Sequence, residues 1–95
     1  MAKPKTTHQV LNYRVIIEPE VVKSQTVYNA YCPTLELADY GDTVEAALKS
    51  MRSMMKFHIE CLIEEGQLVP QPDHPESFVS MTSIKIPLTA GIQYA

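Results

Sequence analysis

Few side chains in this chain of 95 residues stand where they could do chemistry together. His58 and Cys61 are three residues apart, a spacing that puts both on one face of a helix. A tetrahedral metal site needs about four ligands, so Cys32 and His74 would have to converge with this pair. No paired spacing supports that convergence, and His58 also fits a core-edge histidine. We therefore expect no metal ligand and no cofactor.

The groups needed for catalysis are equally sparse. The chain has three glycines, too few for a Gly-rich phosphate loop, and no Ser or Cys lies in a local nucleophile motif. Asp39 and Asp42 resemble a carboxylate pair, but Asp42 is also explained as a helix cap. We expect no catalytic residue and no enzymatic activity.

The charge balance argues against nucleic acid as the main partner. The chain carries 8 Lys and Arg against 11 Asp and Glu, a formal net charge of −3, whereas phosphate-binding proteins usually carry a basic excess. Lys49, Arg52 and Lys56 are the only close basic set, and their spacing also fits the solvated face of a helix. The acidic balance instead suits a basic protein partner.

Composition places the chain among small globular proteins, with 45% apolar and 20% charged residues. No window approaches the roughly 18–20 apolar residues of a membrane helix. Two widely spaced cysteines without a secretory signal indicate a reducing compartment. We therefore expect a cytoplasmic protein.

Periodic patterns predict a two-layer α+β domain. Apolar residues alternate over residues 11–17, which predicts a strand. Residues 18–20 contain Pro19 and are expected to end or bend that strand, because proline cannot donate to a ladder. After a turn at residues 23–25, further strands over residues 26–32 and 35–40 complete an antiparallel β-meander.

A long helix follows the meander. Gly41 permits a tight corner, and Asp42 with Glu45 fits a capping box, with Thr43 as an alternative cap. Good helix formers lead to Gly66, the expected C-cap residue. One stripe of side chains is expected to face the core: Val44, Ala47, Leu48, Met51, Met55, His58, Ile59 and Leu62.

Beside that stripe, Met54, Phe57 and Cys61 widen the apolar surface on one flank. Either a curled sheet covers these three residues or they meet another chain, because large exposed apolar patches usually mark interfaces. Beyond the helix, Pro70 and Pro72 prevent the helix from resuming.

Apolar alternation returns over residues 81–88 and predicts a last strand, which gives the order β-β-β-α-β. Pro87 argues for an edge position, and exposed edges invite pairing. We therefore expect a homodimer that uses Ile84, Ile86 and Leu88 together with the helix flank. The predicted organisation is a frayed N-terminus at 1–9, one domain over 10–88 and a tail at 89–95.

Four segments, in this order, resemble the HicB-type antitoxin family. They are Tyr13-Arg-Val-Ile-Ile-Glu18, Tyr28-Asn-Ala-Tyr-Cys-Pro-Thr-Leu35, Gly41-Asp-Thr-Val-Glu-Ala-Ala-Leu48 and Glu65-Gly-Gln-Leu-Val-Pro-Gln-Pro72. The third is similar to the family's Gly-Asp-Thr-x-Glu-Glu-Ala-Leu helix start, and the fourth to its Gly-x-x-Ile-Pro-x-Pro exit.

The resemblance implies a HicB-like fold, related to double-stranded-RNA-binding shapes, and a function. Members of the family bind and neutralise a small basic HicA toxin, an mRNA-cutting ribonuclease. The glycine often found after the family's Pro-x-Leu element is Glu36 here, and nothing after Leu88 forms a DNA-binding domain, so we expect no autonomous DNA binding. The hypotheses are a HicB-like antitoxin or an orphan relative, a small RNA-binding module, and a hydrolase with a residual RNase-H-like site. The last would need several carboxylates converging on a divalent metal, and no such set is evident.

A basic toxin would call for carboxylates on the surface that covers it. The candidates are Glu18 and Glu20 at the first hairpin, and Glu36 and Asp39 before the helix. A third cluster stands at the helix end: Glu60, Glu64 and Glu65. We favour Glu36 and Asp39, because the sequence suggests no structural role for either.

Overall fold

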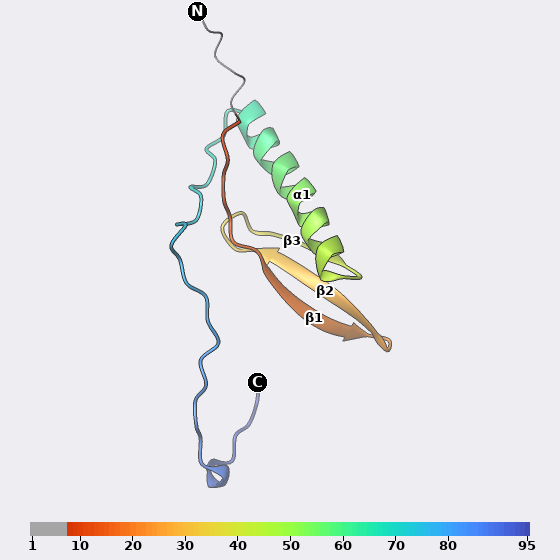
Figure 1. Ribbon diagram of the computed structural model, residues 1–95, viewed down its shortest axis with the longest axis vertical. Helices are drawn as coiled ribbons and strands as arrows, with labels where there is room; N and C mark the ends of the chain where they lie inside the picture. The colour runs from red at the N-terminus through yellow and green to blue at the C-terminus, as the bar shows by residue number, and fades with distance from the viewer. Residues whose placement is uncertain (1–7) are drawn as a thin grey trace, which may run out of the picture.

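In the computed structural model of the chain, which describes residues 8–95, a helix lies across one face of a three-stranded antiparallel sheet (Figure 1). The elements are β1 (Ile16–Val22), β2 (Gln25–Cys32), β3 (Leu37–Gly41), α1 (Val44–Glu64) and the short 3-10 helix η1 (Leu88–Ala90). The sheet order is β1-β2-β3. This confirms the predicted α+β class and the predicted β-β-β-α order. Of the predicted frayed N-terminus, residues 1–7 lie outside the described residues.

Strands β1 and β2 form a hairpin closed by Lys23 and Ser24, whose φ angles are 49° and 67°. Two positive φ angles in a two-residue loop match the twist of the flanking strands. Pro19 lies inside β1, opposite Tyr28, so the strand does not end at residues 18–20. A proline is tolerated there because β1 is an edge strand of the sheet that the described residues form.

The first strand begins at Ile16 rather than at residue 11. Ile16 pairs with Tyr31 near the end of β2, and the chain beyond β2 soon reaches Pro33, which has no N–H to donate. Residues 11–15 therefore form no β-ladder with β2. The predicted burial of one face still holds, because the odd-numbered side chains of this segment are half-buried and the even-numbered ones are exposed.

A four-residue turn joins β2 to β3, and in it the Glu36 amide donates to the Pro33 carbonyl at 3.2 Å. The third strand therefore begins at Leu37, two residues later than predicted. Leu35 lies in the turn but is buried in the core. The turn thus supplies a core side chain as well as a connection.

Helix α1 is capped at both ends by local hydrogen bonds. The Thr43 hydroxyl accepts from the Ala46 amide at 3.0 Å. Thr43 is therefore the N-cap, which confirms the alternative cap, and the predicted capping box of Asp42 with Glu45 is wrong. At the other end the C-cap is Glu65, and Gly66 follows it with φ 70°. The Gly66 and Gln67 amides donate to carbonyls of the last turn, the Schellman pattern that a left-handed glycine permits.

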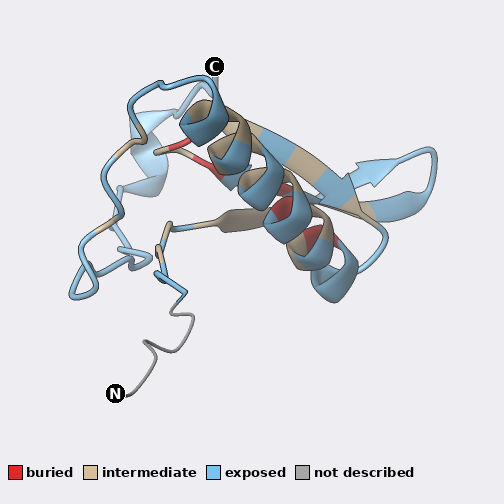
Figure 2. Cartoon of the chain, turned by 90° about the horizontal axis from the view of Figure 1, so that it is seen from above, coloured by how far each residue is buried: buried red, intermediate tan, exposed pale blue. Residues whose placement is uncertain are grey.

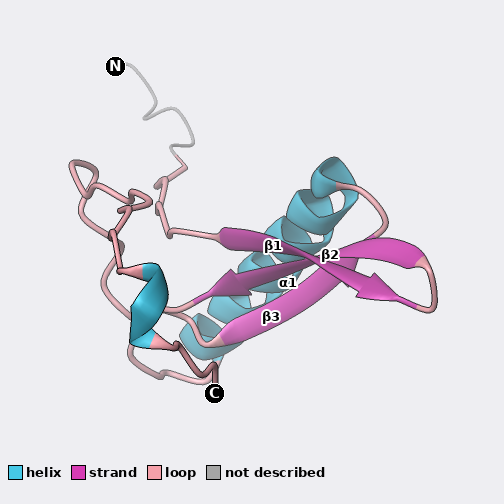
Figure 3. Cartoon of the chain, turned by 90° about the horizontal axis from the view of Figure 1, so that it is seen from below, coloured by secondary structure: helices cyan, strands magenta, loops and turns pink. Residues whose placement is uncertain are grey.

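The core lies between α1 and the strands β2 and β3 (Figure 2). Its fully buried members are Ala30, Cys32, Leu35, Ala47 and Met51. The predicted helix stripe is otherwise half-buried, apart from Val44 at the first turn, which is exposed. The opposite face of the sheet is not covered by the helix (Figure 3).

The predicted returning strand over residues 81–88 is not formed. After Gly66 the chain runs past residues 12–14 and then leaves the domain as an extended arm (Figure 1). A strand exists only when a neighbour completes its ladder, and within residues 8–95 no segment pairs with residues 81–88. Among residues 8–95, no helix has both the length and the apolar character needed to span a bilayer.

Candidate functional site

Asp39 has a structural role that the sequence did not suggest. It stands on the helix-facing side of β3, opposite Ala30, and accepts hydrogen bonds from the Ser50 hydroxyl of α1 and from the Tyr40 amide. These two bonds, the Ser50 one first, hold the pKa of the Asp39 carboxyl below its ordinary value. Asp39 therefore ties the sheet to the helix and is not a free surface carboxylate.

Glu36 is exposed, but its backbone has φ 55°, in the left-handed region that favours glycine. This is the position at which the HicB-type pattern often carries glycine. With Glu36 in place of glycine the turn still forms, but the backbone of Glu36 is strained.

Glu18 and Glu20 lie together on the uncovered face of the sheet. Residues directly opposite one another share a face, and Glu18 stands in one row with Asn29 and Tyr40. Asn29 donates to the Glu20 carboxylate at 2.5 Å. The structure thus separates these two carboxylates from Asp39, which is on the other face.

We call this surface the outer sheet face. It consists of alternate side chains of the three strands: Ile16, Glu18, Glu20, Val27, Asn29, Tyr31, Ala38 and Tyr40. Tyr31 is 46% exposed and Tyr40 64% exposed. Aromatic rings beside two carboxylates give this face both apolar area and negative charge. The helix-end cluster of Glu60, Glu64 and Glu65 is exposed and lies elsewhere, on α1 and its C-cap.

Gly41 is required by packing. A Cβ built on it would lie 2.5 Å from the Ala47 nitrogen and 2.8 Å from the Ala46 carbonyl carbon. The first turn of α1 therefore rests directly on the end of β3. Its backbone φ is not positive, so the reason for the glycine is this close approach and not the conformational freedom that we expected.

A set of hydrogen bonds, which we call the clamp, holds residues 70–73, after α1, to the rest of the domain. Asp73 accepts from the Arg14 amide and from the Thr34 hydroxyl, both at 2.6 Å, and the first of these contributes most to lowering its pKa. The Asp73 amide donates to the Asn12 carbonyl at 2.9 Å. The Tyr13 hydroxyl donates to the Pro70 carbonyl at 2.6 Å.

Burial raises the pKa of the Tyr13 hydroxyl, and nearby Cys32 and Asp73 add to the rise. Tyr13 therefore stays protonated and keeps its donor. The clamp joins residues 57 and 59 positions apart, and only the paired prolines hinted at an ordered segment here. The sequence predicted none of these contacts.

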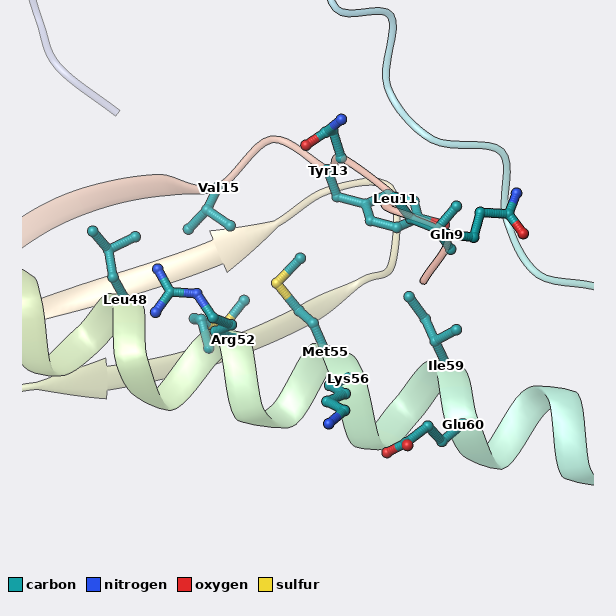
Figure 4. Close-up of a pocket in the computed structure, with 12 residues that line it drawn as sticks. Gln9, Leu11, Tyr13, Val15, Leu48, Arg52, Met55, Lys56, Ile59 and Glu60 are labelled. Carbon is teal, nitrogen blue, oxygen red and sulfur yellow. The ribbon is translucent and has the colours of Figure 1, made fainter. Parts of the chain in front are cut away.

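A groove of about 570 Å³ runs between α1 and residues 9–15 (Figure 4). We call it the helix groove. Its apolar lining comes from both walls: Leu11, Tyr13, Val15, Leu48, Met55 and Ile59. Arg52 and Lys56 also border it, whereas Lys49 is exposed elsewhere on the helix.

The apolar flank predicted from the sequence lies on the other side of α1 from this groove. Met54 packs against the core, Cys61 is half-buried and Phe57 is 69% exposed. Cys32 is buried and His74 is exposed, and no group of three His, Cys, Asp or Glu in the described part of the chain is arranged to hold a metal ion.

Among known proteins, this chain is similar to the UPF0150 protein ssr1765 of Synechocystis sp.. It is 38% identical over 69 residues, which cover 72% of this chain and 84% of the relative. This chain belongs to the UPF0150 family. No family model matches it, and no solved structure gives a significant match.

For this UPF0150 protein the structure leaves two surfaces without an assigned role. The outer sheet face is acidic and aromatic, and the helix groove is apolar. The first offers charge and ring contacts to a partner, and the second offers a concave apolar lining.

Proposed function

We propose that this protein is a binding module of the HicB antitoxin type, acting in the cytoplasm and carrying out no reaction itself. Its partner is a small basic ribonuclease of the HicA type, which it neutralises by covering the surface that holds RNA. The ordered resemblance of residues 13–72, the membership of UPF0150 and the net charge of −3 support this proposal.

The observation that carries it is the outer sheet face. A surface that binds RNA must be positive to hold phosphates, and carboxylates placed against it guide encounter and fix orientation. Glu18 and Glu20 supply these carboxylates on adjacent rows, and exposed Tyr31 and Tyr40 supply the aromatic contacts that dominate many interfaces. Since Asp39 is engaged by Ser50, the proposed contact moves from the Glu36 and Asp39 region to this face.

The test uses a small basic protein encoded next to this chain. Its expression alone should arrest growth, and co-expression of this chain should restore growth. With purified proteins, Glu18→Lys with Glu20→Lys should slow association about tenfold at low salt and weaken its salt dependence. Tyr31→Ala should mainly speed dissociation.

The matched control is Glu64→Lys with Glu65→Lys, which makes the same charge change at the helix end and should leave association nearly unchanged. Equal effects of the two pairs would refute the outer sheet face as the contact. No binding to any neighbouring basic protein, together with binding of RNA, would instead favour the RNA-binding module.

A further inference from the structure

The C-terminal arm, residues 78–95, carries apolar side chains that are mostly exposed. Phe78 is 96% exposed and Met81 fully exposed, and the exposed set continues with Ile84, Ile86 and Leu88. The chain exposes 8861 Å², against roughly 5,500 Å² for a compact domain of its mass. Its radius of gyration is 19.0 Å, against about 12 Å for a compact domain of this length. The excess area is more than the roughly 800 Å² that each partner buries in a stable interface.

The same chain contains an apolar groove without an occupant. Leu48, Met55 and Ile59 point from α1 towards residues 9–15 across the helix groove (Figure 4). From Leu48 to Ile59 the helix runs about 17 Å, which an extended segment of about five residues spans. Ile84 and Ile86 lie in the arm and Leu88 begins η1. When these five residues are extended, the three side chains share one side.

The arm does not reach the groove of its own chain. The clamp fixes Asp73 against residues 12–14, and residues 9–15 run between α1 and the chain that leads to the arm (Figure 1). To enter its own groove the arm would have to reverse and cross over that segment. Beyond the clamp it leads away from the domain, so a second copy of the chain is the occupant that the geometry admits.

We propose that two copies of this chain form a two-fold dimer, in which the arm of each lies in the helix groove of the other. Ile84, Ile86 and Leu88 contact Leu48, Met55 and Ile59 of the second copy. Because the exchange is reciprocal about a two-fold axis, both arms and both grooves are used and the assembly closes at two. The proposal does not depend on the proposed function, since the groove lies on the helix side of the sheet and the outer sheet face remains free.

The first experiment measures the mass in solution by light scattering between 1 and 100 µM. The full chain should have twice the mass of 10.7 kDa. Ile84→Lys with Ile86→Lys should return the mass of one chain, because a charged side chain is costly to bury against the apolar lining and Arg52 and Lys56 at the border of the groove would repel it. Ser77→Lys with Ser83→Lys adds the same charge just before the arm and on its other side, and should leave the dimer intact. A monomeric unaltered chain would overturn the proposal, as would a dimer that persists with the Ile84 and Ile86 changes.

The second experiment identifies the contact. In a Cys61→Ser background, one chain carries Ile86→Cys and another carries Ile59→Cys. Oxidation of the mixture should give a disulfide-linked pair containing one of each, as mass spectrometry reports. Chains with Ile86→Cys alone that cross-link to one another as readily would show that the arms pair with each other. A chain carrying both changes that links only internally would show that the arm fills its own groove. Either result overturns the exchange.

Discussion

At Glu36 one residue bears the strain of the turn between β2 and β3. A side chain at φ 55° costs about 1–2 kcal/mol, and glycine avoids this cost while losing more backbone entropy on folding. Glu36→Gly should therefore stabilise the protein by about 0.5–1 kcal/mol, seen as a higher denaturant midpoint. Glu36→Ala removes the same carboxylate but keeps the strain, so it should give no such gain. Equal gains from both would assign the effect to charge.

The bond between Ser50 and Asp39 predicts a pH-dependent contribution. The pKa of Asp39 is lowered in the folded protein, so its stabilisation is complete above the unfolded value of about 3.9 and is lost as pH falls through the folded value. Ser50→Ala should raise the Asp39 pKa in an NMR titration and cost about 1 kcal/mol at neutral pH. That difference should vanish in acid. Ser53→Ala, on the exposed side of the helix, should change neither; an unmoved Asp39 pKa in Ser50→Ala would contradict the assignment.

Gly41 has no room for even a methyl group. The atoms that a Cβ would meet belong to the backbone of Ala46 and Ala47 and cannot rotate away. Gly41→Ala should therefore destabilise the protein by about 1–3 kcal/mol, measured by denaturant unfolding. Gly66→Ala is a useful comparison, because its cost comes from φ 70° and not from a clash. A neutral Gly41→Ala would mean that α1 docks less closely on β3.

At the scale of elements, the clamp around Asp73 holds the segment after α1 against the domain. Its hydrogen bonds to Arg14 and Thr34 replace the ladder that residues 12–14 lack. Asp73→Ala should make the Arg14 amide exchange faster with solvent and expose residues 66–77 to protease. Glu76→Ala, an exposed acid of the same segment, is the control. Unchanged exchange at Arg14 would show that the clamp does not hold the arm.

At the scale of the whole molecule, the arm makes stability depend on concentration. If folding is coupled to exchange of arms, each tenfold rise in protein concentration should raise Tm by about 3–5 °C. The Ile84→Lys with Ile86→Lys chain should have a Tm that does not change with concentration. Calorimetry at several concentrations measures both. A constant Tm for the unaltered chain would mean that the domain folds without its partner.

The sequence by itself determined the elements whose signals are local. Alternation placed β2 within one residue, and the Thr43 hydroxyl and Gly66 marked the ends of α1 within one or two. These signals are short-ranged because a cap or a left-handed residue acts on amides and carbonyls within one helical turn. The α+β class followed from their order.

Only the tertiary structure decided the contacts that join distant parts of the chain. The Tyr13 and Asp73 clamp links residues 57 and 59 positions apart. The hydrogen bond from Ser50 shows that Asp39, a candidate partner contact in the sequence, instead connects the sheet to the helix. Such pairs leave no periodic trace, because each partner looks like an ordinary polar residue. The predicted strand at residues 81–88 failed for the same reason. The alternation of apolar residues there is typical of a strand, but a strand forms only where a neighbouring strand supplies the partners for its backbone hydrogen bonds.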